Sequence, residues 1–229
     1  MKLRQKLYIA ITTLFALCSC ARDNDNYAAP DAEIYGSIID QVTNEPVPSE
    51  QPNGFRIRMI SEAYGEPTPI DFWGKADGTF QNKKVFSGKY KVIPIEGAFF
   101  PVDTQQVVIS GSTELNFKVI PFLSITASAT ADANTIVTKF TISRSRAGGK
   151  IKVCKSLIAP YPTLSNSVFD KAITRDLSGV DDETILSTEF RDTIPDVQPG
   201  KTYYVRVTAA TENTLNKYNY STVMKVETP

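Results

Sequence analysis

The segment ADGTFQNKKVFSGKYKVIPI, residues 76–95, decides the fold class. It contains two runs, GTFQNKKVF and GKYKVIPI, in which apolar and polar residues alternate, and each run adjoins a turn signal, ADG or FSGK. A period of two residues is typical of strands with one buried face. It places Phe80 and Tyr90 on that face, while Gly78 and Gly88 suit turns that need a positive φ. The segment therefore predicts two antiparallel strands.

The same alternation continues on both sides, and no stretch after Ala32 keeps a helical period over several turns. The first series also contains EIYGSIID, FRIRMI, PIDFWGK, TQQVVIS and ELNFKVI. The pattern pauses at Pro121, and a second series follows with LSITASAT, NTIVTKFTISR, KIKVCKSLI, KTYYVRVTAAT and YSTVMKVET. Short strands at this spacing, separated by Pro, Gly, Asn and Asp, favour β-sandwiches. We predict an all-β chain with two tandem β-sandwich domains, residues 32–121 and 122–229.

Residues 1–19 have the layout of a secretory signal peptide. Three basic residues precede an apolar run from Leu7 to Leu17, and small polar residues follow it. The run is about eleven residues long, whereas a membrane-spanning helix needs roughly 20 apolar residues, so a transmembrane helix is the weaker interpretation. The sequence LCSC resembles the bacterial lipobox, which implies that Cys18 leaves with the signal peptide and that Cys20 becomes the lipidated first residue. The alternative is soluble secretion after a nearby cut, with Cys20 merely retained.

Residues 20–31 are polar and show no hydrophobic periodicity, so we expect a short flexible tether behind the lipid. Several acyl chains on one cysteine would hold the protein firmly, because each buried methylene contributes about 0.8 kcal/mol. Asp23 and Asp25 loosely resemble the acidic export signal of Bacteroidetes surface lipoproteins. We expect an outer-membrane, lipid-anchored protein that faces the cell surface rather than the periplasm.

The composition excludes many kinds of chemistry, because the chain contains no histidine. Catalytic triads with a histidine base, His-ligated zinc sites and H-E-x-x-H proteases are excluded. Two acidic clusters remain, DNDN at 23–26 and DDE at 181–183. The first departs from a calcium loop, since Ala28 stands at the sixth position and no Glu stands at the twelfth. The second lies in a polar segment that we expect to be a solvated loop. We therefore expect no catalytic residue, no metal site and no cofactor.

Cys154 is the only thiol left once Cys18 is removed and Cys20 is acylated, so we expect no intramolecular disulfide. It alternates with Ile151 and Val153, which is typical of a strand residue rather than an activated nucleophile. The full chain has 25 basic and 25 acidic residues, and removal of residues 1–19 takes three basic ones, which leaves 22 − 25 = −3. This balance does not resemble a nucleic-acid-binding protein.

The first domain is similar to the carboxypeptidase regulatory-like, transthyretin-type sandwich. The family shows a G-x-(I/V)-x-D opening strand followed by a Pro, then a D-G-x-F turn and a G-x-Y-x-(V/L) strand. The matching positions are Gly36, Ile38, Asp40, Pro46, Asp77, Gly78, Phe80, Gly88, Tyr90 and Val92.

The second domain resembles fibronectin type III through VQPGKTYYVRVTAAT, residues 197–211. The resemblance makes Tyr203 the tyrosine corner, whose hydroxyl returns to upstream backbone. The chain departs from that family at Phe140, where a Trp is usual, and in the long stretch 156–183. We expect that stretch to hold a short helix near Ser167 to Thr174.

The order of these features resembles a family of two-domain Bacteroidetes lipoproteins of unknown function. By context, the resemblance implies an accessory of starch-utilisation-type systems, beside a TonB-dependent transporter and its glycan-capturing lipoprotein partner. We expect a noncatalytic module that binds a polysaccharide. The alternative is a structural or adhesive spacer that binds a neighbouring membrane complex and no sugar. A glycosidase is the weakest hypothesis, because no two acids can be placed at the required separation from sequence.

The run PIDFWGK, residues 69–75, contains the candidate ligand site. If Ile70 and Phe72 point inward, Asp71, Trp73 and Lys75 lie on the opposite face. An indole ring with charged neighbours suits a sugar, because the ring stacks on a pyranose while the charges bind hydroxyls. The alternative is that the ring packs, since Trp is usually well buried. A bulge near Gly74 would then turn it into the core or against the second domain.

Overall fold

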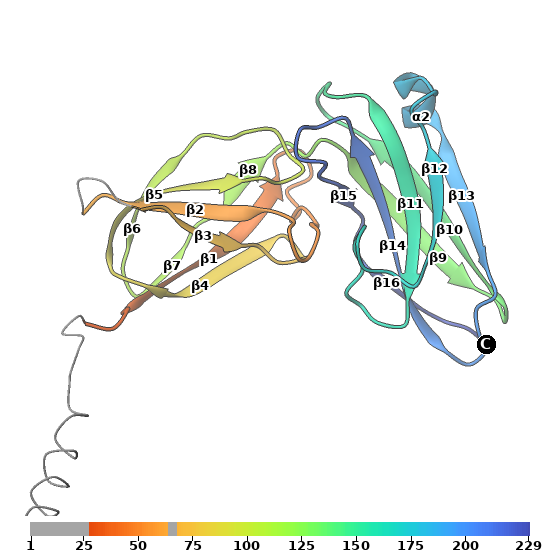
Figure 1. Ribbon diagram of the computed structural model, residues 1–229, viewed down its shortest axis with the longest axis horizontal. Coiled ribbons are helices and arrows are strands. Elements are labelled where there is room, and N and C mark those ends of the chain that lie inside the picture. The colour runs from red at the N-terminus through yellow and green to blue at the C-terminus, as the bar shows by residue number, and fades with distance from the viewer. Residues whose placement is uncertain (1–27, 64–67) are drawn as a thin grey trace, which may run out of the picture. The chain divides into compact units, whose positions relative to one another are not determined.

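The computed structural model describes residues 28–63 and 68–229 (Figure 1). The predicted signal peptide, Cys20 and most of the predicted tether lie outside the described residues. The fold occupies a unit from Asp31 to Pro229 that is built almost entirely from strands. This confirms the all-β prediction. Within the part of the chain that the structure describes, no helix is long and apolar enough to cross a bilayer.

The first series of strands forms two facing sheets. One has the order β4-β1-β7, with β8 also paired to β1, and the other has the order β3-β2-β5-β6. The strands are β1 (Ala32–Asp40), β2 (Arg56–Ser61), β3 (Ile70–Trp73), β4 (Thr79–Val85), β5 (Gly88–Ile95), β6 (Gln105–Ile109), β7 (Ser112–Glu114) and β8 (Phe117–Val119). The contacts of β1 with β7 and β8 are parallel, and the other ladders of this series are antiparallel. Side chains from both sheets form one buried core, which includes Ile34, Phe55, Ile57, Phe80 and Phe117.

The second series forms another sandwich. One sheet has the order β13-β10-β9, and the other has the order β12-β11-β14-β15, with β16 also paired to β14. The strands are β9 (Ser124–Ala131), β10 (Thr135–Ser143), β11 (Ile151–Ala159), β12 (Lys171–Asp176), β13 (Glu189–Pro195), β14 (Thr202–Thr211), β15 (Asn219–Tyr220) and β16 (Met224–Glu227). A short helix, α2 (Asp182–Ser187), precedes β13. Buried residues of β10, β11 and β14 form the core between the sheets.

The opening segment behaves as its alternation predicts, with one exception. Phe80 and Tyr90 are buried, and Gly78 has a positive φ of 82°. Gly88 is not among the positive-φ glycines of the described chain, so that expectation is wrong. It begins β5 and pairs with Ile109. The turn before it is held instead by Asp31, whose carboxylate accepts hydrogen bonds from the backbone N–H and the hydroxyl of Ser87.

The stretch 156–183 differs from expectation at two places. The helix expected near Ser167 to Thr174 is wrong, because β12 occupies Lys171–Asp176 and completes the sheet beside β11. The helix lies later, and Asp181 caps it by accepting hydrogen bonds from the N–H groups of Glu183 and Thr184. Asp182 binds the N–H of Ile151 and the guanidinium of Arg144. The DDE cluster is therefore a helix start with structural contacts rather than a solvated loop.

Two predictions about the second sandwich, those for Tyr203 and Cys154, are confirmed. The hydroxyl of Tyr203 accepts a hydrogen bond from the backbone N–H of Gln198 at 3.0 Å, which is the tyrosine corner. Phe140 is buried and stacks on Phe190 with ring centroids 5.1 Å apart. Cys154 is a buried residue of β11, and burial raises the pKa of its thiol to about 12, so it is held as an inert thiol.

Loops of the first sandwich contact the second. Asn219 of the second sandwich donates from its side chain to the carbonyl of Ala98 in the first at 2.9 Å. Strand ladders, in contrast, join strands of the same series throughout the described chain. The division into two independently folding domains at Pro121 stays a prediction.

Candidate functional site

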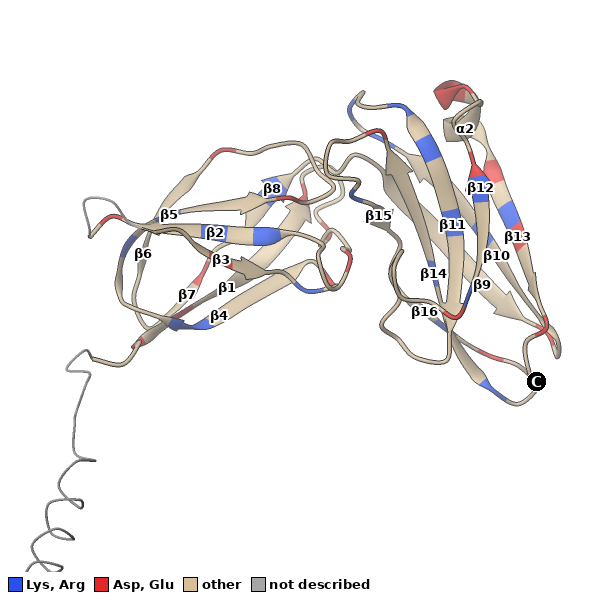
Figure 2. Cartoon of the chain, viewed as in Figure 1, with Lys and Arg blue, Asp and Glu red and all other residues tan. Residues whose placement is uncertain are grey.

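The candidate site begins on the solvent-facing side of the sheet β3-β2-β5-β6, called here the outer face. Ile57 and Met59 of β2 point into the core, so Arg56 and Arg58 lie on the outer face. The register then forms two rows across three strands, Trp73–Arg56–Ile95 and Asp71–Arg58–Ile93. Figure 2 shows the basic residues of β2 within this sheet.

Trp73, the single tryptophan of the chain, is 43% exposed. Its neighbour Phe72 packs inward, with its ring centroid 6.2 Å from that of Phe80. The strand alternation therefore sends Trp73 outward, as the sequence predicts. The alternative that the ring packs into the core is wrong, because a buried indole would not retain this exposure. The other alternative, packing against the second domain, is met only in part, since Lys217 of the second sandwich contacts the ring.

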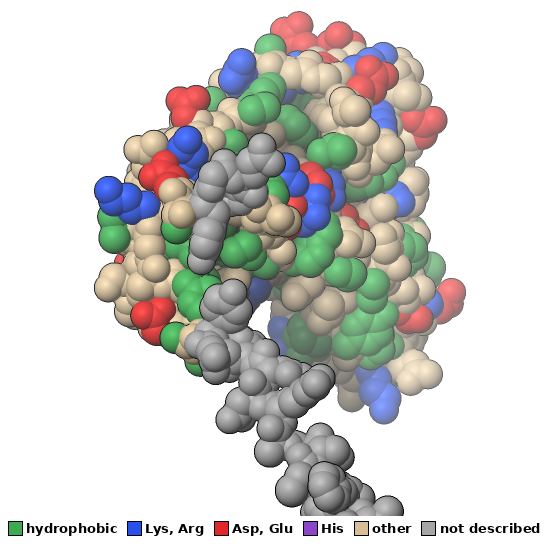
Figure 3. Space-filling view, turned by 60° about the vertical axis from the view of Figure 1, so that its left-hand side comes forward, with side chains coloured by type: hydrophobic (Ala, Val, Ile, Leu, Met, Phe, Trp, Pro, Cys, Tyr) green, Lys and Arg blue, Asp and Glu red, His purple; other side chains and the backbone are tan. Residues whose placement is uncertain are grey.

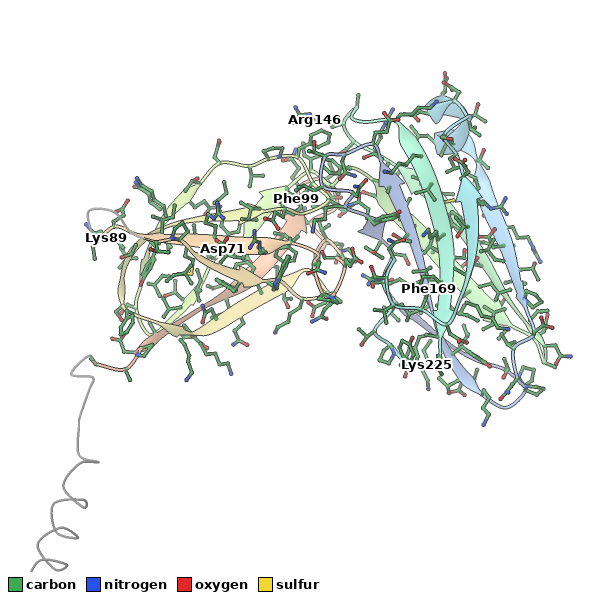
Figure 4. The ribbon with its side chains drawn as sticks, viewed as in Figure 1. Asp71, Lys89, Phe99, Arg146, Phe169 and Lys225 are labelled. Atoms are coloured by element: carbon green, nitrogen blue, oxygen red, sulfur yellow. The ribbon has the colours of Figure 1, made fainter. Side chains whose placement is uncertain are left out.

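Asp71 lies on the outer face beside Arg58 and is labelled in Figure 4. Arg58 binds the carboxylate with two nitrogens, Nε at 2.8 Å and Nη2 at 2.7 Å. Arg56 approaches the same carboxylate at 3.4 Å. The hydrogen bonds from Arg58 hold the pKa of Asp71 below its ordinary value, and the positive charges of both arginines act in the same direction. Asp71 is therefore an ionised, fixed acceptor.

Two cations lie near the ring of Trp73. The guanidinium carbon of Arg56 is 5.2 Å from the ring centroid, and the ammonium nitrogen of Lys217 is 5.7 Å from it. Both distances suit cation–π contacts. Lys217 comes from the segment between β14 and β15, and its ammonium donates to the carbonyl of Asn53 at 2.5 Å. Burial lowers the pKa of Lys217, with Glu96 and Glu50 acting against this effect.

Two expectations about this strand are wrong. Ile70 is 42% exposed rather than buried, because it begins β3, the edge strand of its sheet, and no further strand covers it. Lys75 does not share the strand face, because β3 ends at Trp73. Gly74 lies tightly against Phe55, where an added Cβ would be 2.0 Å from the ring, and the chain turns there. Lys75 sits in that turn, with its N–H bonded to the carbonyl of Thr79.

A groove of about 420 Å³ adjoins the outer face. Ile93 and Ile95, the β5 members of the two rows, line it, and so does Glu96, which pairs with Arg56. Phe99, labelled in Figure 4, and Leu215 add apolar walls. Leu215 is 53% exposed. Figure 3 shows acidic and basic side chains lying beside hydrophobic ones on the face of the molecule that it draws.

This arrangement offers an apolar platform, fixed charged hydrogen-bonding groups and an apolar groove. Such a combination suits noncovalent recognition of a polar ligand with an apolar face. Within residues 28–63 and 68–229, no group of three or more Cys, Asp or Glu side chains is placed to hold a metal ion.

Sequence reasoning found Trp73 and Asp71 but missed Arg56, Arg58 and Lys217. The two arginines were within reach, because the alternation in FRIRMI places them opposite the apolar residues. The sequence could not identify Lys217, because this residue reaches Trp73 from a connection between two strands of the second sandwich.

Comparisons with known proteins place the fold. Residues 32–120 match the family model described as protein of unknown function (DUF3823), N-terminal domain. A DUF3823 family protein from Bacteroides uniformis aligns with a TM-score of 0.77 and 22% identity, covering 87% of this chain and 100% of that one. One from Parabacteroides merdae aligns at 0.74 and 18%, covering 87% of this chain and 100% of that one.

A third solved structure, also from Bacteroides uniformis, is provisionally described as a carbohydrate binding protein. It aligns with a TM-score of 0.75 and 23% identity, covering 86% of this chain and 99% of that one. The comparison with curated proteins finds no match. At these identities the solved structures establish a shared fold.

Proposed function

We propose a function from the site itself: noncatalytic carbohydrate binding on the outer face. Residues 32–120 match the model of the DUF3823 N-terminal domain, a family whose function is unknown. The exposure of Trp73 carries this proposal. Burial of an indole stabilises a folded protein, yet the indole of Trp73 is 43% exposed and lies beside fixed charged groups. The solved relative that is provisionally described as a carbohydrate binding protein supports the same class of ligand.

The geometry supports a saccharide in particular. The apolar face of a pyranose stacks on an indole, while its equatorial hydroxyls point sideways toward neighbouring polar groups. Asp71 and Arg58 form the cross-strand pair next to the pair of Trp73 and Arg56, on the same face of the sheet. Their ion pair keeps both groups fixed, so a hydroxyl meets a preformed acceptor and donor.

The groove extends this platform. Its volume of about 420 Å³ falls within the range of small-molecule sites, roughly 300 to 1,000 Å³. Glu96 lies at the boundary, where it pairs with Arg56 and lines the groove. A glycan chain that stacks one residue on Trp73 would extend a second residue toward Glu96.

For the cellular setting, we propose a lipid anchor on Cys20 that holds the protein at the outer membrane, facing the cell surface. The lipobox-like LCSC and the acidic residues behind it support this setting. The partners would be a TonB-dependent transporter and its glycan-capturing lipoprotein, with this protein as an accessory that raises the local concentration of a polysaccharide.

A glycan array tests the proposal, with the wild-type protein and Trp73→Ala compared at equal concentration. We expect the wild type to bind at least one class of glycan and Trp73→Ala to lose that binding while it remains folded by circular dichroism. Since Trp73 is the single tryptophan, its fluorescence gives an independent titration of each hit. A folded Trp73→Ala protein that binds every wild-type hit equally well would reject this site.

The second candidate function is a structural spacer that binds a neighbouring membrane complex and no sugar. One observation favours it: Arg206 of β14 is 1% exposed and donates hydrogen bonds to backbone carbonyls of both sandwiches, among them Ser49 at 2.9 Å and Leu164 at 2.8 Å. A buried junction of this kind suits a spacer that must keep its ends in place. Pull-down of a membrane complex from cells, with an empty glycan array, would support the spacer.

A further inference from the structure

The cations near Trp73 differ in whether they have an anionic partner. Arg58 is paired with Asp71, and Arg56 is paired with both Asp71 and Glu96. Lys217 has no carboxylate within ion-pair distance in the described part of the chain. Its ammonium instead contacts the carbonyl of Asn53 and the face of Trp73. The site therefore brings one positive charge that its own acids do not neutralise directly.

The ammonium of Lys217 has spare capacity. It carries three N–H donors, and the carbonyl of Asn53 takes one of them. It is also partly removed from water, which is why the pKa of Lys217 is lowered. A charge in such a setting interacts more strongly with an incoming anion than a fully solvated charge does.

The guanidinium of Arg56 adds a second unsatisfied donor. Its Nε is buried and has no hydrogen-bond acceptor among the described residues. Around the exposed indole, Arg56 and Arg58 are thus ion-paired with Asp71 and Glu96. Within the part of the chain that the structure describes, Lys217 makes no ion pair, although Glu96 and Glu50 lie near enough to act on its pKa.

We propose that the glycan bound at this site is acidic, and that Lys217 binds its anionic group, a uronate carboxylate or a sulfate ester, beside the ring of Trp73. This inference rests on the proposed function and names the class of saccharide. The sugar ring stacks on the indole, and its anionic oxygens accept the free N–H donors of Lys217. The second sandwich thereby supplies the charge preference of a platform built by the first.

Matched saccharide pairs test this inference, with the fluorescence of Trp73 as the readout. Oligogalacturonate is compared with its methyl-esterified form, and chondroitin sulfate with unsulfated chondroitin. An array of neutral and acidic glycans accompanies them. We expect the array hits to be acidic, with binding weakened by 0.5 M NaCl because salt screens charge. The first pair identifies a carboxylate and the second a sulfate as the group recognised.

Variants of Lys217 then assign the residue. Lys217→Gln removes the charge, and we expect at least about tenfold weaker binding of the acidic hits, as is typical for loss of a charge-assisted hydrogen bond. Lys217→Arg keeps the charge and should retain most of the affinity. The matched control is Lys225→Gln, which makes the same change on β16, where Lys225 pairs with Glu227. It should bind as the wild type does.

The outcomes separate the two proposals. Binding of neutral glycans alone, or affinity for acidic hits unchanged in Lys217→Gln, overturns the acidic-glycan inference and leaves carbohydrate binding standing. An array on which the wild type retains no glycan overturns carbohydrate binding and this inference with it. Acidic hits that weaken in Lys217→Gln but not in Lys225→Gln support both.

Discussion

The guanidinium of Arg206 donates a hydrogen bond to the backbone carbonyl of Ser49, which lies 157 residues earlier in the chain, at 2.9 Å. It donates further bonds to the carbonyls of Leu164 and Ser221, and its guanidinium carbon lies 4.3 Å from the ring centroid of Tyr220. Burial lowers the pKa of Arg206 to about 10, so the side chain stays protonated at neutral pH. One buried cation thus joins loops of the first sandwich to β14 of the second.

The first prediction concerns this junction. Arg206→Met keeps the apolar stem but leaves several buried carbonyls without a donor, so we expect a loss of roughly 3 to 5 kcal/mol in the free energy of unfolding. Urea denaturation followed by circular dichroism measures it. Arg191→Met, at an exposed position of β13, is the control and should change stability by less than about 0.5 kcal/mol. Equal stability of the two variants would contradict a stabilising role for Arg206.

Trp73 and Phe72 give a second, paired prediction, because adjacent residues of β3 face opposite ways. Trp73→Ala removes an exposed ring with two cation–π contacts and should cost about 1 to 2 kcal/mol. Phe72→Ala removes a ring packed on the core and should cost about 3 kcal/mol or more. Thermal and urea unfolding of both variants checks the order, and a reversed order would show that Trp73 serves packing.

The third prediction uses pH. Because the pKa of Asp71 is lowered in the folded protein, its ionised form stabilises the fold above the unfolded-state pKa of about 3.9. This contribution is lost as pH falls through the folded-state pKa. Asp71→Asn should therefore be less stable than the wild type near pH 7, with the difference shrinking in acid. Urea unfolding of both proteins between pH 7 and pH 2.5 measures the difference, and a difference that stays constant over this range would contradict the prediction.

The fourth prediction concerns the anchor. Cys20→Ala should abolish membrane attachment, because it removes the thiol that carries the lipid. Cys18→Ala should leave attachment intact, since Cys18 belongs to the discarded peptide. Metabolic labelling with a fatty acid tests both, and label that persists on Cys20→Ala would disprove the lipobox assignment.

The fifth prediction concerns the boundary at Pro121. A fragment from Pro30 to Pro121 and another from Phe122 to Pro229 should each unfold cooperatively, because each contains complete sheets and a core. The second fragment should be the less stable of the two, because its buried Arg206 no longer has the backbone carbonyls of Ser49 and Ala76 as acceptors. Two fragments that both fail to fold would show that the chain is a single domain.

Local sequence pattern determined which residues form strands and which way many of them face. The two-residue alternation of apolar and polar residues predicts that Phe80 and Tyr90 are buried, and that Trp73 and Asp71 face outward, as the structure has them. The positive φ of Gly78 and the corner made by Tyr203 follow in the same way from short motifs. These features depend on residues only a few positions away in the chain, so a short stretch of sequence is enough to predict them.

Tertiary structure alone decided which distant groups meet. Lys217 rather than Lys75 reaches Trp73, because Gly74 packs on Phe55 and ends the strand before Lys75. Residues 171–176 became a strand rather than a helix because β11 pairs with them along its edge. Arg206 looks like any charged residue of an alternating strand, yet it is buried because carbonyls from both sandwiches satisfy its donors. A repeating pattern specifies the face on which a side chain lies, whereas its partners across space depend on how the sheets and loops pack.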